Sequence, residues 1–118
     1  MKPFFIVGPC VIEDTVIMNE VGSYVKYLAS KYCVDFYFKS SFDKANRTSL
    51  TSYRGVGMAT GLQILSDIKE TYKLPIVTDI HEPFQALPVS KIADIIQIPA
   101  FLCRQTDLLL QLRIRVKQ

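Results

Sequence analysis

Residues 57–78, GMATGLQILSDIKETYKLPIVT, join a helical pattern directly to a strand pattern, and this junction decides the fold class. Over 57–72 the small and apolar residues recur every three or four positions, as on one face of a helix. Residues 74–78 are a short apolar run, which is typical of a buried strand. A crossover helix that leads into a buried strand indicates a βαβ unit with parallel strands.

The rest of the chain repeats this alternation. Strands are predicted at 4–7, 34–38, 74–78 and 92–98. Helices are predicted at about 14–31 with Asp14 or Thr15 as N-cap, at 57–72, at 83–90, and from 105 to about 112 with Thr106 as cap. The order βαβαβαβα predicts an α/β fold with a parallel sheet. It leaves open whether the sheet is doubly wound or part of a closed barrel.

Length and composition exclude several classes of protein. The chain has 118 residues, enough for one domain, whereas a complete (β/α)8 barrel needs about 250 residues. With 49% hydrophobic and 21% charged residues it is a folding chain rather than a disordered one. The net charge of +3 is dispersed and argues against a nucleic-acid partner.

Cysteine usage and hydropathy bear on the compartment. The three cysteines, Cys10, Cys33 and Cys103, form no C-x-x-C pair, and the first residues lack the pattern of a signal peptide. We therefore expect reduced thiols and a cytoplasmic location. No apolar stretch reaches the ~18 residues of a membrane span, so no membrane association is expected.

Polar residues gather just after each predicted strand, where parallel α/β folds place their chemistry. The segment KSSFDKANRTS at 39–49 holds two lysines, an arginine, an asparagine and four hydroxyls in eleven residues. Such donors suit a phosphorylated or carboxylated small molecule. The alternative is a solvated polar loop. The chain contains neither a P-loop motif nor the complete glycine pattern of a dinucleotide site.

Two further residues have open interpretations. Cys10, after the first strand, is either a reactive group or a small buried hydrophobe. His81, beside Asp79 and Glu82, is either part of a metal or acid–base cluster or a hydrogen-bonded structural group. One cysteine and one histidine do not make a metal site, which needs at least a third protein ligand.

Four segments together resemble the 3-deoxy-D-manno-octulosonate 8-phosphate synthases. They are GPCVIE at 8–13, FKSSFDKANRTS at 38–49, TDIHE at 78–82 and QIPAFLCRQTDL at 97–108. The resemblance covers roughly residues 4–110. The related synthase of the shikimate precursor shares the Gly-Pro-Cys turn and a Lys…Arg-Thr-Ser pattern, but it is not similar to this chain through Phe-Asp-Lys-Ala-Asn.

The resemblance implies a fold and an activity. The fold is the N-terminal half of a (β/α)8 TIM barrel, about four βα units, in an enzyme that forms a homotetramer. The activity is a transferase reaction of lipopolysaccharide biosynthesis. Phosphoenolpyruvate condenses with D-arabinose 5-phosphate, and phosphate leaves by C–O cleavage to give 3-deoxy-D-manno-octulosonate 8-phosphate.

The resemblance also implies residue roles. Lys39, Lys44 and Asp79 take catalytic positions, with both lysines binding phosphoenolpyruvate and Asp79 facing the sugar. The implied substrate-binding set is Lys39, Ser40, Lys44, Asn46, Arg47, Thr48, Asp79, Gln97, Ala100 and Arg104. Of these, Gln97 and the backbone of Ala100 belong to the phosphoenolpyruvate pocket. Residues 46–48 are implied to bind the phosphate of the pentose, with Thr48 in a position usually held by serine. Arg104 lies in a loop that reaches towards a neighbouring subunit's site.

Cys10 matches the metal-ligand position of the metal-dependent members, so the resemblance implies a divalent metal such as iron, manganese or zinc. The other ligands of the family, His, Glu and Asp, lie further along its sequence, and His81 is not one of them.

The resemblance stops near Leu110. Residues 111–118, QLRIRVKQ, alternate apolar and basic side chains, more like a strand than the helix expected there. Taking 1–118 as one partial barrel domain, we expect a truncated or frameshifted product that is inactive by itself. The alternative function is a non-catalytic anion-binding or subunit-interaction module.

Overall fold

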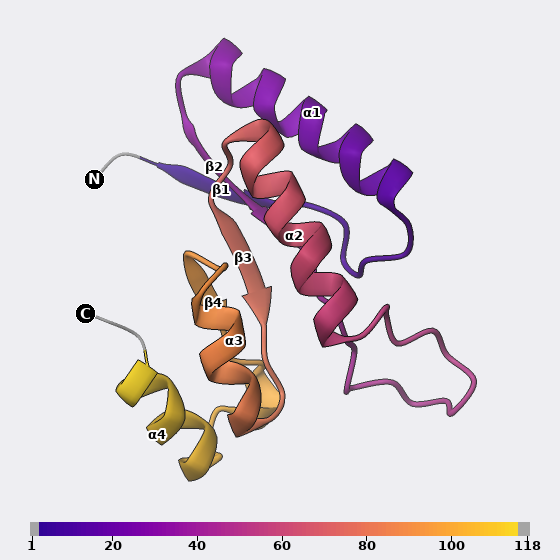
Figure 1. Ribbon diagram of the computed structural model, residues 1–118, viewed down its shortest axis with the longest axis vertical. Helices are drawn as coiled ribbons and strands as arrows, with labels where there is room; N and C mark the ends of the chain where they lie inside the picture. Colours follow the sequence, from indigo (N-terminus) through magenta and orange to yellow (C-terminus); the bar gives the residue numbers. More distant parts are fainter. Residues whose placement is uncertain (1–2, 116–118) are drawn as a thin grey trace.

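The computed structural model describes residues 3–115 and confirms the predicted alternation of strands and helices (Figure 1). The strands are β1 (Phe4–Val7), β2 (Asp35–Lys39), β3 (Ile76–Asp79) and β4 (Ile95–Gln97). The α-helices are α1 (Thr15–Tyr32), α2 (Met58–Tyr72), α3 (Ala86–Ser90) and α4 (Thr106–Arg115). Short 3₁₀ turns η1 (Pro83–Gln85) and η2 (Ala100–Leu102) precede α3 and α4.

The strand order settles which parallel architecture the chain adopts. All three strand pairs are parallel, and the order is β1-β2-β3-β4, the order of the sequence. A doubly wound sheet reverses its order at a switch point, whereas a (β/α)8 barrel adds each strand beside the last. Since right-handed crossovers in such an order bring the helices to one face, the four βα units form part of a TIM barrel. Figure 1 shows α1 and α2 running side by side, and they pack against each other.

Local signals explain where the first long helix begins and ends. Asp14 caps α1, because its Oδ1 accepts a hydrogen bond from the Ile17 amide at 2.9 Å. Cys33 closes the same helix in the left-handed conformation, with φ of 52°. A glycine commonly takes that position, and Cys33 replaces it here.

The core lies between the sheet and the helices. Strand side chains that do not enter this core lie on the opposite face of the sheet. Phe38 of β2 and Ile76 of β3 are fully buried in one cluster with Leu65 and Ile68 of α2. Because successive side chains of a strand point to opposite faces, Lys39 lies on the face that the helices leave open.

The first strand corrects an expectation. Residues 4–7 read as a buried strand, but their side chains are 38–52% exposed. The reason is position: β1 is an edge of the sheet, with β2 as its one neighbour among the described residues. A continuous apolar run therefore does not by itself show that a strand is buried. The strand also needs a neighbouring strand on each side and a packed layer on each face.

The C-terminal segment also differs from the structure expected from its sequence. Residues 111–118 were expected to be strand-like, but 111–115 continue helix α4, and 116–118 lie outside the described residues. Leu108 is buried and Leu112 packs against the core four residues later, which is the spacing of one helical face. In the described part of the chain, no helix is long and apolar enough to cross a membrane.

Candidate functional site

The last residue of each of three adjacent strands has a polar side chain. Lys39, Asp79 and Gln97 are the last residues of β2, β3 and β4. Asp79 and Gln97 are direct partners in the sheet, and Lys39 pairs with Val77, two residues before Asp79. The structure therefore places Lys39, Asp79 and Gln97 at the carboxyl ends of adjacent strands, where the sequence analysis expects polar residues to gather.

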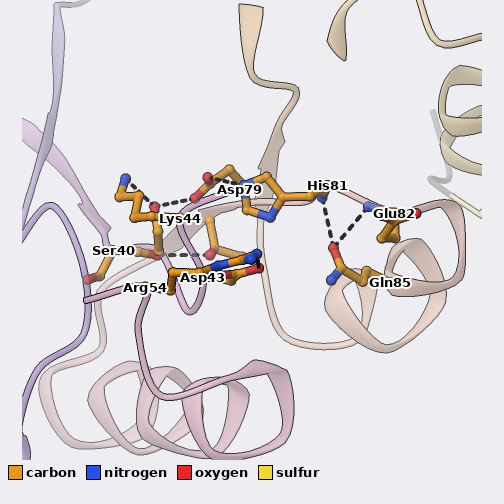
Figure 2. Close-up of polar contacts among 10 residues, drawn as sticks. Ser40, Asp43, Lys44, Arg54, Asp79, His81, Glu82 and Gln85 are labelled. Carbon is orange, nitrogen blue, oxygen red and sulfur yellow. Dashed lines mark hydrogen bonds and ion pairs between the residues drawn. The ribbon is translucent and has the colours of Figure 1, made fainter. Parts of the chain in front are cut away.

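Asp79 is the centre of a buried polar network at this edge (Figure 2). Its side chain is 6% exposed. One carboxylate oxygen, Oδ1, accepts a hydrogen bond from the Ser41 hydroxyl. The other, Oδ2, lies 3.1 Å from His81 Nε2. Lys44 Nζ donates to Ser41 Oγ at 2.8 Å, so the serine links this cation to the carboxylate.

The network keeps Asp79 ionised. Burial alone would raise the pKa of its carboxyl group, but the hydrogen bonds from His81 and Ser41, with the positive charges of Lys39 and Lys44, hold that pKa below its usual value. The site thus presents a fixed negative charge near two lysines, an arrangement that can order a polar substrate and stabilise developing charge.

This lowered pKa predicts an acid-sensitive fold. Because the folded pKa of Asp79 lies below the unfolded value of about 3.9, its contribution to stability is complete above that pH and is lost as the pH falls below it. Denaturant unfolding of the 118-residue chain between pH 3 and 6 should show this loss. Asp79→Asn should flatten the profile, whereas Asp67→Asn, at an exposed site on α2, should leave it unchanged. Parallel profiles for the native chain and Asp79→Asn would contradict the assignment.

His81 also belongs to the site, although it is not among the site residues expected from the sequence. Its side chain is 5% exposed, and its ring meets the Phe42 ring edge-on at 6.4 Å. Nδ1 has no hydrogen-bond partner among residues 3–115. The D-x-H spacing was the available signal, because alternate residues of an extended segment share a face. Glu82 does not join them: it forms a capping box with Gln85 instead.

The polar cluster at 39–49 divides into two parts. Lys39 and Lys44 are half-buried at the sheet edge, whereas Asn46, Arg47 and Thr48 are exposed on the loop before α2. Arg47 Nε donates to the Tyr53 carbonyl at 3.1 Å. The structure therefore places the two lysines together with Asp79 and holds 46–48 apart from them.

The remaining predicted binding residues lie around this edge. Ser40 is fully buried, and its hydroxyl has no partner within the described chain. Ala100 and Arg104 are exposed in and after η2. Within residues 3–115 the Arg104 guanidinium does not hydrogen-bond to the Asp79 network.

Cys10 is exposed just beyond the end of β1, so its interpretation as a buried hydrophobe is wrong. Its carbonyl accepts the Ser41 amide at 3.3 Å, which places it next to the Asp79 network. Residues 3–115 contain no group of three or more His, Cys, Asp or Glu that could hold a metal ion. The described residues therefore do not form a complete metal centre.

Comparison with known proteins gives one family. The model of the DAHP synthetase I family matches residues 1–113. The chain is 58% identical over 104 residues to a 2-dehydro-3-deoxyphosphooctonate aldolase of Helicobacter hepaticus, an alignment covering 88% of this chain and 38% of that protein. It is 55% identical over 108 residues to the Campylobacter jejuni protein of the same name, covering 92% and 40%. For Fusobacterium nucleatum the identity is 51% over 105 residues, covering 89% and 38%.

These relatives confirm the predicted resemblance, since their name is a synonym of the synthase that the four sequence segments resemble. The chain spans about two fifths of the length of the curated relatives it matches.

Proposed function

Because this chain belongs to the DAHP synthetase I family, we propose that the whole protein condenses phosphoenolpyruvate with D-arabinose 5-phosphate. The products are 3-deoxy-D-manno-octulosonate 8-phosphate, a lipopolysaccharide precursor, and phosphate. Relatives of 51–58% identity carry the name of that activity, which supports the proposal.

The observation that carries the proposal is the buried network in which Lys44, Ser41 and His81 surround Asp79, with Lys39 beside it. Phosphoenolpyruvate brings a phosphate and a carboxylate. Two lysines beside this network supply positive charge for these groups.

In this proposal Lys39 and Lys44 bind phosphoenolpyruvate, and Gln97 and the Ala100 backbone complete its pocket. Asp79 accepts a hydrogen bond from the sugar. A carbon–carbon bond forms between the enol carbon and the sugar aldehyde, water adds at the neighbouring carbon, and the bond from that carbon to the phosphate oxygen breaks. The protein's task is to hold the two reacting carbons together and to stabilise the developing charges.

Other contacts of the whole enzyme are also proposals. Asn46, Arg47 and Thr48 take the phosphate of the pentose, and Arg104 reaches a neighbouring subunit in a homotetramer. Cys10 is one ligand of a divalent metal, iron, manganese or zinc, whose other ligands come from outside the described residues. The enzyme works in the cytoplasm.

A chimera tests the activity. Residues 1–108 of this chain are joined to the remaining part of the Helicobacter hepaticus relative, and phosphate release from phosphoenolpyruvate is measured. We expect turnover with D-arabinose 5-phosphate and at least about 100-fold less with the shorter D-erythrose 4-phosphate, since the site binds a pentose chain. The 118-residue chain by itself should release no phosphate, because the two outer strands of its sheet lack the neighbouring strands that would close a barrel.

The intact relative, assayed in parallel, is the control for the chimera. A folded chimera that releases no phosphate, while the relative does, would contradict the proposed activity. Turnover by the 118-residue chain would contradict its expected inactivity.

A second function, a non-catalytic anion-binding module, is favoured by one observation. The lysines near Asp79 and the loop arginine all lie within residues 3–115. Saturable binding of phosphoenolpyruvate by the 118-residue chain, combined with an inactive chimera, would support this module over the enzyme.

A further inference from the structure

The loop between β2 and α2 is closed at its base by an ion pair that the proposed chemistry does not use. Arg54 donates from Nε to Asp43 Oδ1 at 2.9 Å and from a terminal amino group to Oδ2 at 2.7 Å. Two parallel hydrogen bonds of this kind fix direction as well as distance. They join the first residues of the loop to its last ones, eleven positions later.

The pair is ionised at neutral pH. Burial would raise the pKa of Asp43, but the hydrogen bonds and charge of Arg54 hold that pKa below its usual value. The same contacts raise the pKa of Arg54. Because the Asp43 and Arg54 side chains are 24% and 59% exposed, the pair adds little to the stability of the whole fold.

Backbone contacts show that the two loop ends must lie close together. The Gly57 amide donates to the Phe42 carbonyl at 3.0 Å. Gly55 has a φ of +122°, and a Cβ there would lie 2.3 Å from the same carbonyl oxygen. Only glycine permits the returning chain to pass this close, and Arg54 is the residue just before it.

Beyond this base, the loop has few attachments. Tyr53 donates its hydroxyl to the Ile12 carbonyl at 2.9 Å, and Arg47 donates to the Tyr53 carbonyl. Leu50, at the far end of the loop, is completely exposed. The shape of 46–48 therefore depends on the contacts near residue 54.

We propose that the Asp43–Arg54 ion pair is a clasp that holds 46–48 in the shape that binds the pentose phosphate. The inference rests on the proposed function. Asp43 and Arg54 are positioning residues: they do not touch the substrate, and they act through the three residues between them. Lys39 ends β2 and Lys44 is held by Ser41, so neither lysine depends on Arg54. The Asp43 carboxylate also accepts a hydrogen bond from the Lys44 backbone, so Arg54→Gln is the variant that breaks the clasp without touching either lysine.

The test uses the chimera with Asp43→Asn, Arg54→Gln and Arg54→Lys. We expect the KM for D-arabinose 5-phosphate to rise about fivefold to tenfold for the first two, and the KM for phosphoenolpyruvate to change less than about twofold for Arg54→Gln. Arg54→Lys keeps the charge without the paired donors and should fall between. Glu70→Gln, which breaks the exposed Lys73–Glu70 pair on α2, should change neither KM.

A second readout does not depend on activity. Chymotrypsin should cleave after Leu50 faster in Asp43→Asn and Arg54→Gln than in the unaltered chimera or in Glu70→Gln, at unchanged circular dichroism. Equal changes in both KM values, or an unchanged cleavage rate, would overturn the clasp. If the unaltered chimera is inactive, the proposed function fails, and the cleavage rate alone decides for or against the clasp.

Discussion

Asp79→Asn in the chimeric synthase is expected to lower kcat about 100- to 1,000-fold while the protein stays folded. Asparagine keeps the shape of the side chain but removes the charge, and one of its two polar atoms becomes a donor. It can then no longer accept from both Ser41 and His81, which now share the carboxylate. The placement of Lys44 through Ser41 should be lost with it.

The matched control is Asp94→Asn. Asp94 binds Lys69 directly and accepts the Ile76 amide at 2.7 Å, but at the opposite end of β3. This substitution should lower the free energy of unfolding without a comparable loss of kcat. If Asp94→Asn lowers kcat as much as Asp79→Asn does, the role of Asp79 is structural rather than chemical.

Lys39→Met is expected to lower kcat/KM for phosphoenolpyruvate about 10- to 150-fold, the range for losing a hydrogen bond to a charged group. Methionine keeps the length and apolar stem of the side chain, so the packing against β3 should persist. The positive charge that lowers the pKa of Asp79 is removed as well. The measurement is initial-rate kinetics with each substrate varied in turn.

Lys91→Met, at an exposed position after α3, is the control for loss of one positive charge. It should leave both KM values unchanged. A Lys39→Met variant with unaltered phosphoenolpyruvate kinetics would remove Lys39 from the site and leave Lys44 as its main cation.

Much of the fold was predictable because its signals are local. The helical spacing over 57–72, the apolar run at 74–78 and the cap at Asp14 each involve residues within a few positions of one another. Strand endings are local as well, so Lys39, Asp79 and Gln97 could be assigned to one edge of a parallel sheet. The polar segments at these strand ends were also sufficient to identify the family.

The α/β class, the helices and strands and the residues at the strand ends therefore follow from the sequence. Three-dimensional contacts were needed to establish the sequential strand order, the exposure of β1, the hydrogen bond from Ser41 to Asp79 and the closure of the loop by Arg54. The physical reason is that a helix or strand forms from neighbours in the chain. An edge strand, a hydrogen bond between two strand ends or an ion pair that closes a loop depends instead on which distant segments meet, and no short-range pattern encodes that.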